Sequence, residues 1–322
     1  MTVHWMRYLV GDAGNLQRTY LAVKTASEYQ LDNMRAMCEI YLRKYSGQTT
    51  MGERKRGLTN SEWRSAEPHF SFARELDLLD GRNIERWGVS FGAGRTFLNL
   101  WNSGCIPATM LLNQLLTYDR SFLLPFLVRL VETEYDFSTS RYKGLEPKVR
   151  EVWQEIWQTN RNELMNKEPP LPDPKQVKDR TLLHHAASRI RFLSKMEGLG
   201  LNIEKLRRIT EQFAGFEETP RMPQDSFRRI KIALTGEVPK QIQEDYLKEA
   251  ILEAFNKLQR GGHVSAYGTF LFVNERIGEN VTVDWNNFAD HVRKKELYSK
   301  SSSFRRDDQL LSISPELKAE SA

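Results

Sequence analysis

Residues 281–295, VTVDWNNFADHVRKK, are the stretch from which the fold can be worked out. Asp284 is a suitable helix N-cap, and Trp285, Phe288 and Val292 follow at the i, i+3 and i+7 spacing of one helical face. We therefore predict a helix that begins at Asp284 and turns this face toward a core. The opposite face then carries polar and charged side chains: Asn286, Asn287, Asp290, His291, Arg293 and Lys294.

The segments around this helix predict the rest of a small domain. Apolar periodicity indicates helices over 245–258 and 266–277, and Gly261 and Gly262 separate them. Residues 297–302 and 308–313 have the pattern of two short strands that pair around Phe304, Arg305 and Arg306. Three helices followed by a basic hairpin are the order of a winged helix. We predict a C-terminal winged-helix domain over 241–314 and a disordered tail over 315–322.

A similar order occurs near the other end of the chain. Residues 15–45 have the apolar spacing of two helices, and a helix is predicted from Asn60 to Leu79. A turn, a short strand within 85–91 and the Gly92–Gly94 turn then lead into another helix. We predict an N-terminal winged-helix-like domain over 1–104.

The middle of the chain is predicted to be helical. The apolar block 106–137 divides at Asp119 into two helices, and helices are also predicted over 146–165, 182–198 and 202–216. Four prolines within 167–178 indicate a linker between a helical segment, 105–166, and a helical or winged-helix-like segment, 179–240. A second weak segment lies at 218–226. The predicted fold class is mainly α with small β-hairpins, as multiple winged-helix-like units joined by helical segments.

Composition limits the classes of function. The chain has 322 residues, 47 basic against 42 acidic, and a pI near 9.0, which modestly favours polyanionic partners. Cys38 and Cys105 lie far apart and have no metal-ligand spacing, so we expect a reducing cytoplasm. The start of the chain lacks the pattern of a secretory signal. The sequence has no apolar run long enough to span a membrane, so we expect no membrane partner.

The basic residues of the C-terminal domain suggest DNA binding. Asn286, Asn287, His291, Arg293 and Lys294 are residue types that contact base edges and phosphates when a helix lies in a major groove. Lys300, Arg305 and Arg306 of the predicted hairpin would contact the phosphates beside it.

Two other basic groups are present. Arg54, Lys55 and Arg56, in a polar loop before the first unit, would follow a phosphate backbone. Arg221, Arg228, Arg229 and Lys231 are predicted to belong to an exposed, solubilising linker.

Catalytic and metal motifs are not evident. His184 and His185 are adjacent, so on a helix they point in different directions, and no HxxxH or HExxH pattern completes a site. Gly92, Gly94 and Arg95 have the wrong spacing for a dinucleotide or phosphate loop, which favours a tight turn. The acidic residues lack the pattern of a metal-dependent nuclease. We therefore expect no enzymatic activity, no metal and no cofactor.

Two stretches carry a resemblance to a known class of proteins. AEPHFSFARELDLLDGRNIERWGVSFGAGRTFLNLW (66–101) and SRIRFLSKMEGLGL (188–201) resemble winged-helix pieces of the DNA-recognition regions of type IIS restriction endonucleases and related prokaryotic defence proteins. The resemblance covers about half of the chain, and no functional residue is carried over from it. It implies tandem winged helices that hold one duplex, with cleavage performed by a separate domain or subunit.

These observations predict a non-enzymatic DNA-binding protein, or the DNA-recognition subunit of a larger prokaryotic complex, with antiviral defence as its expected role. The alternative is a protein-interaction subunit that scaffolds a multi-protein assembly without binding DNA. The apolar stripe of the helix over 146–165 would then be a docking face; it comprises Val149, Val152, Trp153, Ile156 and Trp157.

Overall fold

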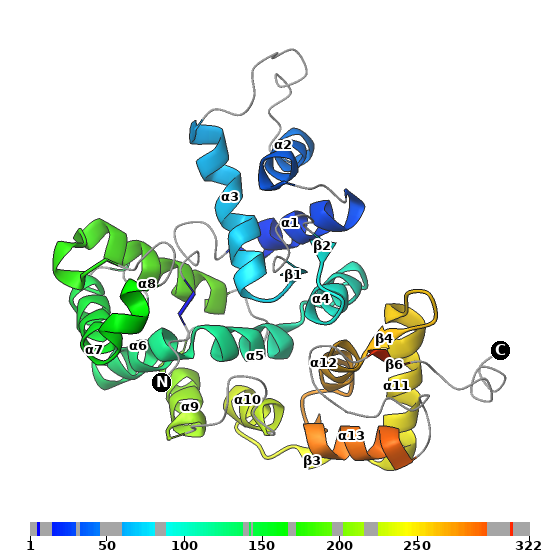
Figure 1. Ribbon diagram of the computed structural model, residues 1–322. Helices are drawn as coiled ribbons and strands as arrows, with labels where there is room; N and C mark the ends of the chain where they lie inside the picture. Colours follow the sequence, from blue (N-terminus) through cyan, green and yellow to red (C-terminus); the bar gives the residue numbers. More distant parts are fainter. Residues whose placement is uncertain are drawn as a thin grey trace.

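The computed structural model describes residues 5–6, 15–29, 33–45, 60–80, 88–137, 142, 144–166, 172–194, 202–215, 225–294 and 310–311. Within these ranges the protein is mainly α-helical, and its strands form three two-stranded sheets (Figure 1). The predicted fold class, mainly α with small β-pairs, is confirmed.

The N-terminal part contains three helices and a strand pair. Helices α1 (Leu16–Glu28) and α2 (Met34–Tyr45) both pack against α3 (Asn60–Glu75). Strand β1 (Leu79–Asp80) then pairs antiparallel with β2 (Gly88–Val89), and α4 (Ala93–Asn102) follows. The two helices predicted within 15–45 are confirmed.

Close packing explains the glycine turn before α4. A Cβ atom on Gly94 would lie 2.0 Å from the carbonyl oxygen of Leu78 and 2.7 Å from Cγ1 of Val89. The backbone of α4 therefore approaches the β1–β2 pair as closely as only glycine permits. Ser90 Oγ accepts a hydrogen bond from Gly94 N at 2.8 Å and caps the helix. The prediction of a tight turn agrees with this geometry.

Six helices make up the middle of the molecule, shown from cyan to yellow-green in Figure 1: α5 (Ala108–Tyr118), α6 (Arg120–Glu132), α7 (Glu146–Met165), α8 (Asp179–Ser194), α9 (Ile203–Phe213) and α10 (Ser226–Thr235). Helix α7 packs between α6 and α8, and α9 packs on α6 and α10. The predicted division at Asp119 and the predicted helix over 146–165 are confirmed.

The C-terminal part contains α11 (Glu244–Leu258), β4 (Val264–Ser265), α12 (Ala266–Arg276), α13 (Trp285–Lys294) and β6 (Leu310–Leu311). Strands β4 and β6 pair antiparallel, with Val264 opposite Leu311. Strand β3 (Lys240–Gln241), which precedes α11, pairs in parallel with β5 (Val281–Thr282), which precedes α13.

The last strand has a partner that the sequence did not predict. Leu310 and Leu311 pair with β4, a strand that the helical periodicity did not indicate. The predicted pairing of 308–313 with 297–302 cannot be compared, because 297–302 lie outside the described residues. Residues 295–309 and the predicted tail, 315–322, lie outside the described residues.

The predicted linkers are also more ordered than expected. The described part of the proline-rich segment includes a short 3₁₀ helix, η4 (Pro174–Gln176), in which Pro174 is buried. Arg150 of α7 donates a hydrogen bond to the carbonyl of Val177 at 3.1 Å, so this segment is packed against α7. Arg228, Arg229 and Lys231, which were assigned to a linker, belong to α10.

The apolar stripe of α7 lies inside the molecule. All five residues are buried, from 0% exposure at Val149 and Val152 to 8% at Trp157. Helices α6 and α8 cover this face, so the expectation that the stripe is a docking face is wrong.

Candidate nucleic-acid interface

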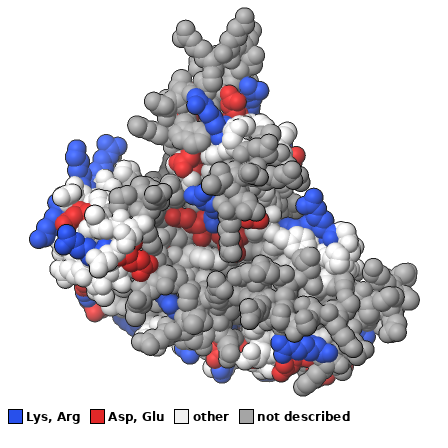
Figure 2. Space-filling view, viewed as in Figure 1, with Lys and Arg blue, Asp and Glu red and all other residues white. Residues whose placement is uncertain are grey.

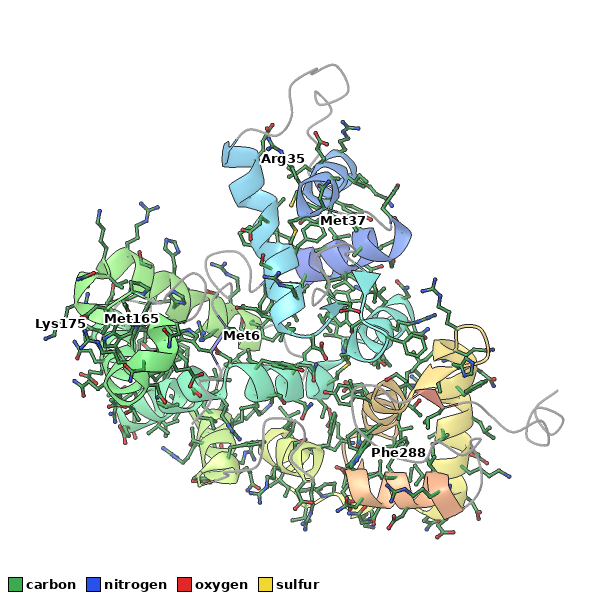
Figure 3. The ribbon with its side chains drawn as sticks, viewed as in Figure 1. Met6, Arg35, Met37, Met165, Lys175 and Phe288 are labelled. Atoms are coloured by element: carbon green, nitrogen blue, oxygen red, sulfur yellow. The ribbon has the colours of Figure 1, made fainter. Side chains whose placement is uncertain are left out.

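Helix α13 forms as its sequence predicts. Asp284 Oδ1 accepts a hydrogen bond from Asn287 N at 2.8 Å and caps the first turn. Phe288 and Val292 are buried at 0% and 2% exposure, and the ring of Trp285 meets that of Phe270 edge-on at 5.1 Å. Figure 3 shows the labelled Phe288 where α13 meets the other C-terminal helices.

The outer face of α13 carries four of the polar residues named from the sequence. Asn286, Asn287, Asp290 and Arg293 are exposed. Arg293 Nη1 lies 3.6 Å from Asp290 Oδ1, and both side chains are more than half exposed. An exposed pair of this kind contributes little to stability.

His291 does not lie on this outer face. It is only 6% exposed and borders a hollow of about 220 Å³ between α13 and the start of α11. The helical phase places His291 on the flank of α13, and β3 with the first turn of α11 covers this flank. Its predicted role as an exposed DNA contact is therefore wrong for this conformation.

The other predicted contacts fall outside the described residues. They are the side chain of Lys294, and Lys300, Arg305, Arg306, Arg54, Lys55 and Arg56. In the sequence, Lys300, Arg305 and Arg306 lie between the end of α13 at Lys294 and the start of β6 at Leu310.

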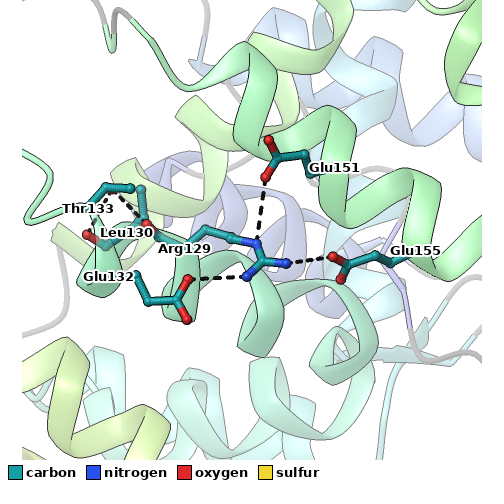
Figure 4. Close-up of polar contacts among 6 residues, drawn as sticks. All are labelled: Arg129, Leu130, Glu132, Thr133, Glu151 and Glu155. Atoms are coloured by element: carbon teal, nitrogen blue, oxygen red, sulfur yellow. Dashed lines mark hydrogen bonds and ion pairs between the residues drawn. The ribbon is translucent and has the colours of Figure 1, made fainter.

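Charge on the visible face is divided among several areas. Figure 2 shows Lys and Arg side chains in separate groups, with Asp and Glu side chains between them, over the part of this face that is described. Arg129 of α6 lies among three glutamates, and its guanidinium meets Glu132, Glu155 and Glu151 at 3.2, 2.6 and 3.7 Å (Figure 4). These contacts tie α6 to α7, and the three carboxylates outnumber the one guanidinium.

The N- and C-terminal parts meet through α4 and α12. Thr96 Oγ1 donates to the carbonyl of Gly268 at 3.0 Å, and Asn99 Nδ2 donates to the carbonyl of Lys257 at 2.8 Å. A Cβ atom on Gly268 would lie 3.0 Å from the carbonyl oxygen of Gly92, so the two backbones are almost in contact. The two candidate DNA-binding parts therefore share one packed junction.

A buried glutamine on α5 joins three parts of the molecule. Gln114 Nε2 donates to the carbonyl of Leu76 at 2.9 Å, and Gln114 Oε1 accepts from the hydroxyl of Tyr267 at 2.6 Å. Burial makes each of these hydrogen bonds costly to lose.

Two charged residues, the buried Lys231 and the partly buried Glu275, fix the C-terminal part to the helical middle. Lys231 Nζ donates to the carbonyls of Asn274 and Gly278, both at 2.8 Å, and to Val281, and burial lowers its pKa to about 8. Glu275 accepts from Met110 N at 2.9 Å at the start of α5, and burial raises its pKa to about 7. The prediction that Lys231 belongs to an exposed segment is wrong, because it is 2% exposed.

A second buried pair lies at the junction of α5 and α6. Asp119 accepts from Arg189 Nε at 2.7 Å and Nη2 at 2.6 Å, and both side chains are fully buried. Met6 N donates to Asp119 Oδ1 at 2.9 Å, and Arg189 Nη2 donates to the carbonyl of Met6 at 3.2 Å. These contacts hold the backbone of Met6, labelled in Figure 3, in the core.

The described residues contain no group of three or more His, Cys, Asp or Glu side chains that would hold a metal ion. Within the same ranges no helix has the length and apolar character needed to cross a membrane. Comparison with family models, with curated proteins and with solved structures finds no match to this chain.

Proposed function

We propose that this chain is a non-enzymatic, cytoplasmic DNA-binding protein, or the DNA-recognition subunit of a larger prokaryotic defence complex. Its main DNA contact is the C-terminal unit α11–β4–α12–α13–β6, in which α13 enters the major groove. The observation that carries the proposal is the pairing of β4 with β6, described above. It brings the chain back to the first helices of the unit after α13, as expected of a winged helix.

The chemistry of α13 supports this role. Asn286 and Arg293 lie on the exposed face, and amide and guanidinium groups are the side chains that form bidentate contacts with adenine and guanine. The segment after α13 adds Lys300, Arg305 and Arg306, whose charges suit phosphate oxygens. The pairing of β6 with β4 places Leu310 and Leu311 beside the strand that leads into α12.

The N-terminal part supplies a second unit of the same kind. Helices α1, α2 and α3 precede the antiparallel β1–β2 pair, so this unit also combines three helices with one antiparallel strand pair. Arg54, Lys55 and Arg56 precede α3 in the sequence. We assign them to phosphate contacts beside this second unit.

Fluorescence anisotropy of a labelled random duplex across a salt series tests the proposal. The variant removes four cations of the C-terminal unit: Arg293→Ala, Lys294→Ala, Arg305→Ala and Arg306→Ala. Each lost phosphate contact reduces the slope of log K against log salt by about 0.9, so the variant should lose up to about 3.6. Circular dichroism and thermal unfolding check that the variant remains folded.

A matched variant controls for total charge. It removes four exposed cations from α8, α9 and the segment before α8: Lys175→Ala, Lys178→Ala, Arg180→Ala and Arg207→Ala. This control should retain wild-type affinity and salt slope. The proposal is refuted if the wild type does not bind at low salt, or if both variants weaken binding equally.

The alternative, a scaffold subunit that does not bind DNA, loses the feature on which it rested. The stripe of α7 is covered by α6 and α8, so it offers no surface to a partner.

A further inference from the structure

A pocket of about 500 Å³ lies at the junction of the N- and C-terminal parts. Its walls come from the end of α1, from β1 and β2, from one side of α4, and from Arg260, which follows α11. In Figure 1 these elements surround α4 at the centre right of the molecule. A hollow of this volume is within the range of small-ligand sites.

Two arginines from distant parts of the sequence line this pocket. Arg95 is on the first turn of α4, and Arg260 is at the turn that leads into β4. Arg95 Nη2 donates a long hydrogen bond, 3.4 Å, to the carbonyl of Gln259, and its guanidinium lies over the ring of Phe91. Within the described ranges neither arginine lies in an ion pair, although Asp80 is also part of the wall.

The two positive charges act on each other. Burial lowers the pKa of Arg95, and the charge of Arg260 lowers it further. Like charges that lie close together destabilise the folded state, and an anion bound between them would reduce this cost. The N-terminus of α4 is already capped by Ser90, so the positive character of the pocket comes from the arginine side chains.

The rest of the wall indicates what kind of anion fits. Val89, Phe91 and Leu98 provide an apolar surface that suits a flat ring. Asn99 uses its Nδ2 for the carbonyl of Lys257, and Asn102 uses its Oδ1 for the hydroxyl of Tyr20, which leaves one amide oxygen and one amide nitrogen for a ligand.

Asp80 adds an acceptor for hydroxyl groups. The pocket therefore has groups that match each part of a nucleotide. The arginines suit a phosphate, Asp80 suits the hydroxyl groups of a sugar, and the apolar wall with its two amides suits a flat base that has hydrogen-bond donors and acceptors. We propose that this pocket binds a mononucleotide, with its phosphate between Arg95 and Arg260 and its base against Phe91 and Leu98. This site is separate from α13 and does not depend on DNA binding.

Isothermal titration calorimetry of the full chain without DNA tests the proposal. The probes are AMP, GMP, CMP and UMP, with inorganic phosphate and adenosine as the partial ligands. At least one nucleotide should bind with a Kd below about 1 mM. The affinity for that nucleotide should exceed the affinity for phosphate. If AMP is the nucleotide that binds, the Kd of adenosine should be at least about ten-fold higher than that of AMP.

Variants link the binding to the two arginines. Arg260→Gln is the main variant, because Arg260 is exposed and its side chain is not needed for packing. It should weaken nucleotide binding by roughly ten-fold or more, as expected for loss of a charge-assisted hydrogen bond. Arg276→Gln, at an exposed arginine outside the pocket, is the matched control and should bind as the wild type does.

Three results would overturn the proposal. They are no binding of any nucleotide, equal binding of phosphate and every nucleotide, and equal weakening by Arg260→Gln and Arg276→Gln. Because these titrations contain no DNA, their outcome is independent of the anisotropy experiment on α13.

Discussion

Replacement of Arg189 by methionine should destabilise the protein by about 3–5 kcal/mol at pH 7, the usual cost of removing one partner from a buried ion pair. The structure gives the reason. Asp119 is fully buried and accepts two hydrogen bonds from Arg189 and one from Met6 N, and the variant would keep only the last of these three. The loss is a large fraction of the about 5–15 kcal/mol that stabilises a typical folded protein.

The double variant Asp119→Leu with Arg189→Met separates the ion pair from simple packing. Because it leaves no buried charge, it should be more stable than Arg189→Met alone. The coupling between the two sites should then be at least about 1 kcal/mol in a double-mutant cycle.

The pH dependence provides a second check on the same pair. Burial already raises the pKa of Asp119, while Arg189 and Met6 N lower it, so removal of Arg189 raises this pKa further. A carboxyl whose folded-state pKa is above its unfolded value binds more protons when folded, and stability therefore falls as pH rises through that interval. Arg189→Met should lose less stability at pH 5 than at pH 7.

Urea unfolding followed by tryptophan fluorescence measures these effects. Trp5 stacks on Phe122 at 5.0 Å and meets Trp153 edge-on at 4.6 Å, so the signal reports on the region around the pair. The reasoning is wrong if Arg189→Met costs less than about 1 kcal/mol, or if the double variant is as unstable as the sum of the single variants.

Three further predictions concern other parts of the fold. The folded-state pKa of Glu275 is about 7, so the wild type should lose about 3 kcal/mol of stability as pH rises from about 4.5 to 7. Glu275→Gln should abolish this pH dependence, and urea unfolding at pH 5 and 8 measures it. The folded-state pKa of Lys231 is about 8, so the unfolded chain binds the proton more tightly and the stability of the wild type should rise between about pH 8 and 10.5. Lys231→Met should abolish this rise. The prediction is wrong if the variant and the wild type change equally in stability between pH 8 and 10. Gly94→Ala should cost more than about 2 kcal/mol through its clash with Leu78, whereas Gly88→Ala meets open space and should change stability by less than about 0.5 kcal/mol; equal melting temperatures of the two variants would contradict this.

Local patterns in the sequence predicted most of the helices. The stripe from Val149 to Trp157 gave the helix over 146–165, and Asp284 marked the start of α13. These features depend on residues within a few turns of one another, so periodicity and capping are sufficient to find them.

The features that were missed depend on residues far apart in the chain. Lys231 resembles part of a solvated basic segment, yet it is buried because it donates to carbonyls 43 and 47 positions away. Strand β4 has only two residues, and its partner lies after α13. His291 is covered by β3 and the start of α11, which helical phase alone cannot indicate. The convergence of Arg95 and Arg260 requires the whole junction between α4 and α12.

The near contact between Gly92 and Gly268 sets the geometry available to a shared ligand. The N- and C-terminal parts are joined through backbone atoms this close, and Thr96 is hydrogen-bonded across the contact. The distance between the two parts is therefore fixed, unlike that between two domains on a flexible linker. If both parts bind one duplex, this fixed distance favours two kinds of DNA. In one, the spacing of successive grooves already matches the distance between the two parts; in the other, the base-pair steps bend easily enough to reach it. The DNA would then bend while the protein stays rigid. Flexible pyrimidine–purine steps between the two contact points would favour binding although the protein does not contact them.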